Sequence, residues 1–255
     1  MSSEFIQLRD IRYCSPGGVA LCLDVLGPAS TTPLATVVRI DGCPGWGPGD
    51  RSSAQLPFAN PALASAGFLT VAISVRHSGQ AVFPAQLHDI QAALSWLRRN
   101  PLGLPVDPDR IGIWGQSAGG HLAALAGLTA SPRTTAADVH AVVTISGPSD
   151  LTRPGGAMRI DRPSPVTALV GGDLEQLPAA SPVTHVSAGA PPFLIIHGTA
   201  DETVPYEQAE ALHRALLAVG ARSRLLPIAG GPHDLRGDQY AVADEAARFF
   251  QESLG

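Results

Sequence analysis

Short runs of β-branched and apolar residues alternate along this chain with longer Ala- and Leu-rich stretches. Because buried parallel strands read as continuous apolar runs, as in Phe193–His197, the pattern predicts an α/β fold with a mostly parallel eight-stranded central sheet and helices on both faces. The expected strands lie near Phe5–Tyr13, Val19–Leu26, Ala35–Asp41, Phe68–Val75, Arg110–Trp114, Val139–Ser146, Phe193–His197 and Ser223–Ile228. The clearest expected helices cover Phe83–Asn100, Ser117–Thr129, Tyr206–Val219 and Asp238–Ser253.

The domain organisation follows from length and from one irregular stretch. The 255 residues suit a single domain over 1–255, and 27 Gly with 23 Pro stay below the level of a low-complexity chain. The first two strands alternate apolar and polar residues, which suits an antiparallel edge of the sheet. Residues 148–186 are rich in proline and lack periodicity, so we expect a cap or lid insertion there.

Charge and cysteine usage exclude several classes of partner. The net charge is −5 and no run of Lys or Arg occurs, so neither nucleic acid nor a membrane surface is expected, and the predicted partner is a small molecule. The cysteines, Cys14, Cys22 and Cys43, lack the spacing of a metal site or a disulfide framework. The opening residues have no signal-peptide pattern, which predicts a cytoplasmic protein. Whether copies of the chain associate is not decided by the sequence.

The motif Gly115-Gln-Ser117-Ala-Gly119 stands directly between a predicted strand and a predicted helix. In this context GxSxG forms a sharp turn that exposes the serine hydroxyl, and the flanking positions must be small because a Cβ would obstruct the turn. The positive end of the helix dipole lies beneath the hydroxyl. Ser117 is therefore the candidate nucleophile, the alternative being a glycine-rich turn with a capping serine.

A serine nucleophile needs a histidine base and an acid that orients it. Of the eight histidines, His233 lies in a glycine-rich loop after the last predicted strand, at the sheet edge where Ser117 is expected. His121, on the helix after Ser117, is interpreted as packing. Asp201 follows the strand Phe193–His197 at the same edge and is the candidate acid, unless it only caps the helix near Pro205. Glu202 and Asp173 are the fallback acids.

These segments resemble a known family, the α/β-hydrolase fold, and within it small esterases related to carboxylesterases and acetyl esterases. The resemblance implies that Ser117, Asp201 and His233 form a catalytic triad and that no metal or organic cofactor is needed. The most specific matching segments are Val106-Asp-Pro-Asp-Arg110-Ile-Gly-Ile-Trp-Gly-Gln-Ser117-Ala-Gly-Gly-His-Leu-Ala, Pro191-Pro-Phe-Leu-Ile-Ile-His-Gly-Thr-Ala-Asp201-Glu-Thr-Val-Pro and Gly231-Pro-His233.

The chain departs from the resembling esterases where an HGGGW-like loop supplies donors to the oxyanion. Gly42, Cys43, Pro44 and Gly45 stand in place of HGGG, and proline has no N–H to donate. The expected donors are then the amide of Ala118 and one from Gly45, Trp46 or Cys43. The alternative is that residues 41–50 are only a proline-stiffened surface loop.

Candidates for a substrate pocket come from several segments. We expect Trp46, Phe83 and Gln116 to contact substrate, with Leu151, Met158 and Leu169 as further apolar lining, although each of these also suits ordinary packing.

The predicted function is hydrolysis of small to medium carboxylic esters through an acyl-enzyme. Alternatives are an amidase, formamidase or oligopeptidase-like hydrolase on the same scaffold, a catalytically weakened ligand-binding member, or an acyl transferase.

Overall fold

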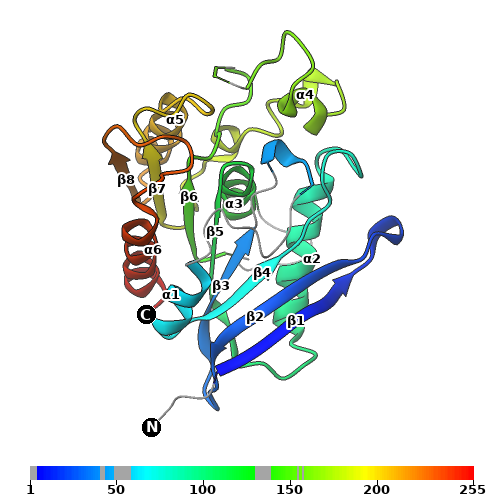
Figure 1. The fold of residues 1–255 in the computed structure, drawn as a ribbon, viewed down its shortest axis with the longest axis vertical. Coiled ribbons are helices and arrows are strands. Elements are labelled where there is room, and N and C mark those ends of the chain that lie inside the picture. Colours follow the sequence, from blue (N-terminus) through cyan, green and yellow to red (C-terminus); the bar gives the residue numbers. More distant parts are fainter. Residues whose placement is uncertain (1–4, 41–43, 49–58, 130–138, 154, 157) are drawn as a thin grey trace.

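A single eight-stranded sheet forms the centre of the protein (Figure 1). The computed structural model describes residues 5–40, 44–48, 59–129, 139–153, 155–156 and 158–255. The strand order is β1-β2-β4-β3-β5-β6-β7-β8, and all neighbours from β4 onward pair in parallel. The strands are β1 (Phe5–Cys14), β2 (Leu21–Pro28), β3 (Leu34–Ile40), β4 (Leu69–Ile73), β5 (Val106–Gln116), β6 (Ala141–Ile145), β7 (Phe193–Gly198) and β8 (Ser223–Ile228).

The first two strands form the antiparallel part of the sheet. β1 pairs with β2, and β2 pairs with β4, both antiparallel. Side chains of β2 are alternately buried and half-buried, whereas every residue of β4 is buried. A strand covered on one face needs apolar residues only at every second position, so the expected antiparallel edge is confirmed.

Helices cover both faces of the sheet and divide its apolar side chains into two cores. Consecutive residues of β5, Ile113 and Trp114, point to opposite faces and belong to different cores. One core receives side chains of α2 (Ala85–Arg99), α3 (Ala118–Leu128) and α5 (Glu207–Ala218). The other receives side chains of α1 (Ala59–Ser65) and α6 (Gln239–Leu254), which contact each other beside the sheet (Figure 1). The predicted α/β-hydrolase architecture is confirmed.

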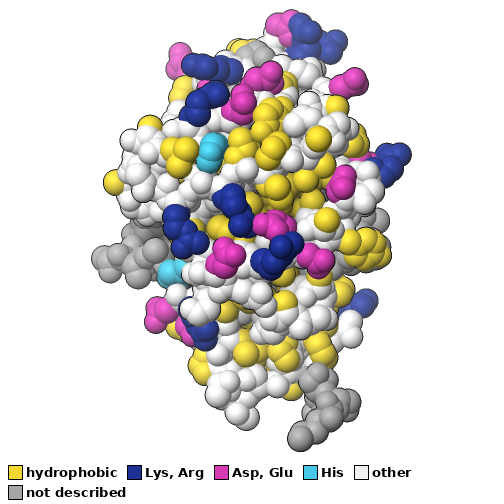
Figure 2. Space-filling model, turned by 90° about the vertical axis from the view of Figure 1, so that its left-hand side faces the viewer, with side chains coloured by type: hydrophobic (Ala, Val, Ile, Leu, Met, Phe, Trp, Pro, Cys, Tyr) yellow, Lys and Arg dark blue, Asp and Glu magenta, His cyan; other side chains and the backbone are white. Residues whose placement is uncertain are grey.

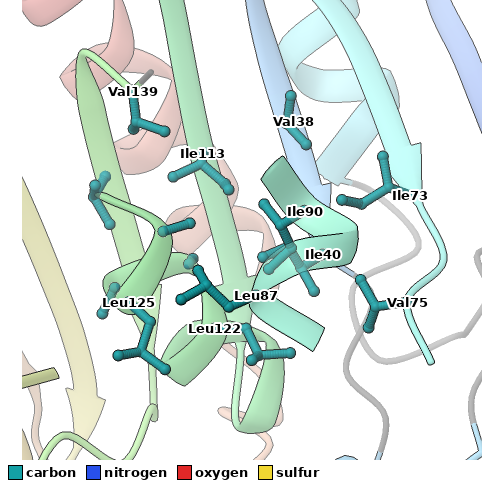
Figure 3. Close-up of a cluster of buried hydrophobic side chains, with 14 of the residues drawn as sticks. Val38, Ile40, Ile73, Val75, Leu87, Ile90, Ile113, Leu122, Leu125 and Val139 are labelled. Atoms are coloured by element: carbon teal, nitrogen blue, oxygen red, sulfur yellow. The ribbon is translucent and has the colours of Figure 1, made fainter. Parts of the chain in front are cut away.

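The larger core is built where α2 and α3 pack on the central strands (Figure 3). Ile113 of β5 and Ile90 of α2 are completely shielded from solvent, and Leu125 of α3 is equally buried. Full burial of such side chains contributes about 1.5–3 kcal/mol each. This packing holds α3, the helix that follows Ser117, firmly against the sheet.

The sequence located the long elements better than the short ones. β5 begins at Val106, earlier than the predicted Arg110, because it pairs with β3 on both sides of a register shift. The short helices α1 and α4 (Pro165–Leu169) were not singled out, since a helix of one or two turns shows little periodicity.

Residues 148–186 connect β6 to β7 above the carboxyl ends of the strands. The described part contains α4, η3 (Leu174–Gln176) and η4 (Pro182–His185), and buries Leu151, Leu169 and Leu177 in the larger core. Among the described residues, no helix has both the length and the apolar character that crossing a membrane requires.

The face shown in Figure 2 carries Arg side chains next to Asp and Glu side chains. Glu245 of α6 forms ion pairs with Arg224 of β8 at 2.5 Å and with Arg248 of α6 at 2.8 Å. This face therefore lacks the continuous positively charged patch that is typical of nucleic-acid-binding surfaces.

Phe250 of α6 is fully buried and lies over Gly112 of β5, where an added Cβ would be 2.5 Å from the ring. We predict that Phe250→Ala lowers the free energy of unfolding by about 3–5 kcal/mol, because it leaves a cavity between helix and sheet. Urea denaturation measures the change. The neighbouring Gln251→Ala, at an exposed site, should change it by less than about 0.5 kcal/mol, and an equal loss in both variants would contradict this packing.

Candidate active site

Ser117 occupies a strained turn between β5 and α3. Its backbone has φ 55° and ψ −123°, a combination that L-residues rarely adopt. The Ser117 amide donates to the carbonyl of Ile145 at 2.8 Å, and the Ser117 carbonyl accepts from the His121 amide at 3.0 Å. These contacts to β6 and α3 hold the strained residue in place and leave its side chain half-buried at the carboxyl edge of the sheet.

The glycine at the start of the motif is required by a close backbone approach. A Cβ on Gly115 would lie 2.4 Å from the carbonyl carbon of Gly119, a separation that atoms do not tolerate. The chain therefore turns back on itself between Gly115 and Gly119 only because no side chain separates them.

His233 reaches Ser117 from a loop that follows β8. Its Nε2 lies 2.9 Å from the Ser117 hydroxyl oxygen. This loop contacts the loop after β7, because the Ala200 amide donates to the Gly231 carbonyl at 3.1 Å. It also contacts the end of β5, where the Gln116 side-chain amide donates to the His233 carbonyl at 3.2 Å. The base and the nucleophile, far apart in sequence, are thereby held within hydrogen-bonding distance.

Asp201 lies on the other side of the imidazole. Its Oδ2 is 2.7 Å from His233 Nδ1, and its Oδ1 accepts from the amides of Thr203 and Val204 at 2.9 and 2.8 Å. Burial alone would raise the pKa of Asp201, but hydrogen bonds from His197, His233 and the Val204 amide together hold that pKa far below its ordinary value. The carboxylate is therefore ionised near neutral pH.

The competing interpretations of the acid do not match the structure. Helix α5 begins at Glu207, after an N-cap residue Tyr206, so Asp201 does not cap it. Glu202 is exposed, and Asp173 accepts the Glu175 amide at the start of η3. Neither fallback acid contacts His233 in the hydrogen bonds described.

A second histidine, which sequence reasoning did not assign to the site, supports the acid. His197 at the end of β7 is fully buried, and its Nε2 lies 3.1 Å from Asp201 Oδ2 and 2.9 Å from the Val204 carbonyl. Because both neighbours only accept, Nε2 carries the hydrogen. The spacing of four residues between His197 and Asp201, across the end of a strand, was the available sequence signal.

The same reasoning fixes the protonation of His233. Its Nδ1 faces a carboxylate and must carry a hydrogen, which leaves Nε2 free to accept the hydrogen of the Ser117 hydroxyl. This arrangement can remove a proton from serine and stabilise the resulting imidazolium. Within the described part of the chain, no three His, Cys, Asp or Glu side chains are grouped to bind a metal ion.

The expected oxyanion donors surround one pocket with Ser117. Ala118 is the first residue of α3, so its amide has no acceptor within the helix. Gly45 and Trp46 lie in the turn η2 (Pro44–Trp46) and border the same pocket. Gly42 and Cys43 lie outside the described residues.

The pocket beside Ser117 is small and mainly apolar. Its volume of about 100 Å³ lies well below the 300–1,000 Å³ usual for drug-sized ligands. Besides Trp46 and Met158, as expected, the lining includes residues that the sequence did not indicate. Among the described residues, the lining consists of Gly45, Trp46, Ser117, Ala118, Pro148, Met158, Pro165, Val166, Thr203 and Val204.

Four expected pocket residues lie elsewhere. Phe83 is buried in the larger core, and its amide donates to the Leu169 carbonyl at 2.8 Å, so it joins the loop before α2 to the insertion. Leu151 and Leu169 are likewise buried in that core. Gln116 contacts the His233 loop through its side chain. Phe83 and Gln116 are not among the described residues that line this pocket, and their role as substrate contacts stays a prediction.

Comparisons with known proteins show which family the chain resembles. A family model described as BD-FAE matches residues 23–216. The probable carboxylic ester hydrolase LipM of Mycobacterium tuberculosis is 36% identical over 216 residues, which cover 77% of this chain and 49% of LipM. The chain spans about half the length of the curated relatives it matches.

Solved structures of similar fold include esterases. A truncated carbohydrate esterase from gut microbiota has a TM-score of 0.84 at 27% identity, with 99% of this chain and 97% of that chain covered. Esterase 2 of Thermogutta terrifontis, phosphonylated by sarin, has a TM-score of 0.82 at 27% identity, with 100% and 95% covered. The resemblance to carboxylesterase-like α/β-hydrolases is confirmed.

We predict that Gly115→Ala disrupts the Ser117 turn, because the added methyl group cannot fit against Gly119. The variant should lose about 1–3 kcal/mol of stability, as overpacked sites do, together with most of its reactivity toward a serine-directed phosphonate. Gly189→Ala is the matched control, since a Cβ there meets nothing within 4 Å. Wild-type stability and labelling in Gly115→Ala would show that the turn does not need this glycine.

Proposed function

The chain belongs to the BD-FAE family, and we propose that it is a serine hydrolase of carboxylic esters in which Ser117, His233 and Asp201 form the catalytic triad. The observation that carries this proposal is the position of one imidazole between the serine hydroxyl at 2.9 Å and a buried carboxylate at 2.7 Å. Ester hydrolases among the relatives support the same assignment.

In the first half of the reaction, the Ser117 oxygen attacks the ester carbonyl carbon while His233 Nε2 accepts the hydroxyl proton. Asp201 stabilises the imidazolium, since its carboxylate remains ionised. The oxyanion accepts hydrogen bonds from the Ala118 amide and from an amide of Gly45 or Trp46, residues that border the same pocket as Ser117. His233 then protonates the departing alkoxide, which leaves an acyl group on Ser117.

Water completes the cycle by the reverse sequence of proton transfers. His233 accepts a proton from water, the resulting hydroxide attacks the acyl carbonyl, and Ser117 leaves with the proton from His233. His233 is in contact with solvent, with a quarter of its side chain exposed. The Asp201 side chain, by contrast, is fully shielded from solvent, so water screens the interaction between its charge and His233 only weakly.

The pocket favours acyl groups of a few carbon atoms. Its volume of about 100 Å³ and its wall of Met158, Val166 and Val204 leave room for a short alkyl chain. The esterase 2 of Thermogutta terrifontis has been determined with bound propionate, a carboxylate of this size. An acetyl or propionyl ester is therefore the proposed substrate class, within the small to medium range that the sequence predicts.

Other features of the proposal come from the sequence. We propose that residues 1–255 act as one domain in which 148–186 form the cap over the pocket, because Pro165, Val166 and Met158 of this segment line it. A cytoplasmic location, a reaction without cofactor and the absence of nucleic-acid or membrane partners stay predictions.

We predict that Ser117→Ala removes hydrolysis of short p-nitrophenyl esters and labelling by a fluorophosphonate, because no hydroxyl remains to attack. A matched panel of esters and anilides measured with both proteins separates esterase from amidase. Ester turnover retained by Ser117→Ala would show that the nucleophile is misassigned. A folded wild-type protein that neither turned over esters nor reacted with the probe would favour the ligand-binding alternative.

We predict that Asp201→Asn lowers kcat by about 10⁴-fold, as the loss of the triad acid does elsewhere, because the amide favours the wrong tautomer of His233. Steady-state kinetics on a short ester measure the change. The control is Asp173→Asn, which alters an acid that caps η3 and should keep kcat unchanged. A loss of kcat in Asp173→Asn, with none in Asp201→Asn, would show that Asp173 and not Asp201 is the triad acid.

A further inference from the structure

His121 connects three parts of the protein around the oxyanion turn. It lies one turn after Ser117 on α3 and is completely shielded from solvent. The Trp46 indole Nε1–H donates to His121 Nδ1 at 3.1 Å, and the two rings meet edge to face with centroids 5.0 Å apart. On the other side of the ring, His121 Nε2–H donates to the Ala180 carbonyl of the insertion at 2.7 Å.

The ring must be neutral to make both hydrogen bonds. An indole N–H only donates and a carbonyl only accepts, so Nδ1 must be unprotonated while Nε2 carries the hydrogen. Burial lowers the pKa of His121 to about 4, in spite of the Ala180 carbonyl that favours the charged form. One tautomer therefore satisfies both neighbours near neutral pH.

Trp46 needs such support because its own backbone is strained. Its φ is 57°, a value unfavourable for a bulky residue, and it follows Gly45 with φ 55°. The Trp46 carbonyl accepts the Ser78 amide at 2.8 Å. Above the turn, Pro165 lies so near that a Cβ on Gly45 would be 2.6 Å from it. The indole hydrogen bond ties this turn to the helix that begins with Ala118.

We propose that His121 is a positioning residue that holds the Gly45–Trp46 turn in the geometry needed to donate to the oxyanion. His121 accepts the hydrogen bond of the Trp46 indole, and it lies on α3, the helix that begins with the other oxyanion donor, Ala118. This inference rests on the proposed serine hydrolase function. It also explains how a turn with Pro44, which lacks an N–H, keeps a usable donor.

The test compares His121→Phe, His121→Asn, Trp46→Phe and the double variant His121→Phe/Trp46→Phe on a short ester. Loss of a single oxyanion donor costs about 10²–10³-fold in kcat, so a displaced donor in His121→Phe should lower kcat by about 10-fold or more while KM changes little. In Asn, Oδ1 occupies the place of Nδ1 and can accept from the indole, so His121→Asn should recover much of kcat. His140→Phe is the matched control, since His140 accepts the Ile111 amide at the opposite end of the sheet.

Two readouts separate positioning from ordinary packing. The double variant should have the kcat of the worse single variant, because both changes break the same contact. The ¹⁵N-indole resonance of Trp46, assigned with Trp46→Phe, should shift in His121→Phe and return toward its wild-type position in His121→Asn. A packing role would give additive losses and no rescue by Asn.

The outcomes also distinguish this inference from the proposed function. Activity that survives Ser117→Ala overturns the serine mechanism itself. If Ser117→Ala is inactive but a folded His121→Phe keeps kcat within about twofold of wild type, the positioning role of His121 is overturned. If His121→Phe does not fold, Trp46→Phe decides, because it removes the same hydrogen bond with His121 intact, and an unchanged kcat there overturns the inference.

Discussion

The strained backbone of Ser117 is the constraint around which the rest of the site is arranged. A residue with φ 55° at the end of a central strand persists only where its surroundings hold it. Here the Ser117 amide donates a hydrogen bond to the Ile145 carbonyl of β6, and the Ser117 carbonyl accepts one from the His121 amide of α3. Because Gly115 has no side chain, the chain can also fold back on Gly119. The same turn fixes where the hydroxyl and the Ala118 amide lie, and so fixes where a substrate carbonyl can bind.

The second constraint is the close contact between the two loops that carry Asp201 and His233. A Cβ on Gly198 would lie 2.1 Å from the Gly231 carbonyl oxygen, so the two loops can approach this closely only because Gly198 has no side chain. Buried Leu235 anchors the end of the histidine loop in the smaller core. Asp201 lies within hydrogen-bonding distance of two imidazoles, those of His197 and His233, which stabilise its negative charge and hold the carboxylate in one orientation.

Sequence reasoning could place the three reactive side chains because each follows a strand of a parallel sheet, and such strands end at one edge. The strands and long helices could be predicted from periodicity, because buried side chains recur at a fixed spacing in each kind of element. The pocket could not be found in this way. Pro148 and Val166 of the insertion meet Thr203 of the loop after β7 there only because of the path that the insertion takes across the sheet. Nothing in the local sequence distinguishes these residues from Phe83 or Leu169, which are buried in the larger core. The role of His121 also depends on contacts to two distant segments.

The account as a whole claims that nucleophile, base and oxyanion donors are assembled in one pocket before substrate binds. The most direct measurement is a crystal structure of the protein inactivated by a short alkyl phosphonate. The account predicts phosphorus on the Ser117 oxygen, with the phosphoryl oxygen about 2.7–3.1 Å from the Ala118 amide and from an amide of Gly45 or Trp46. An adduct on another residue, or a phosphoryl oxygen turned toward solvent without these donors, would contradict it.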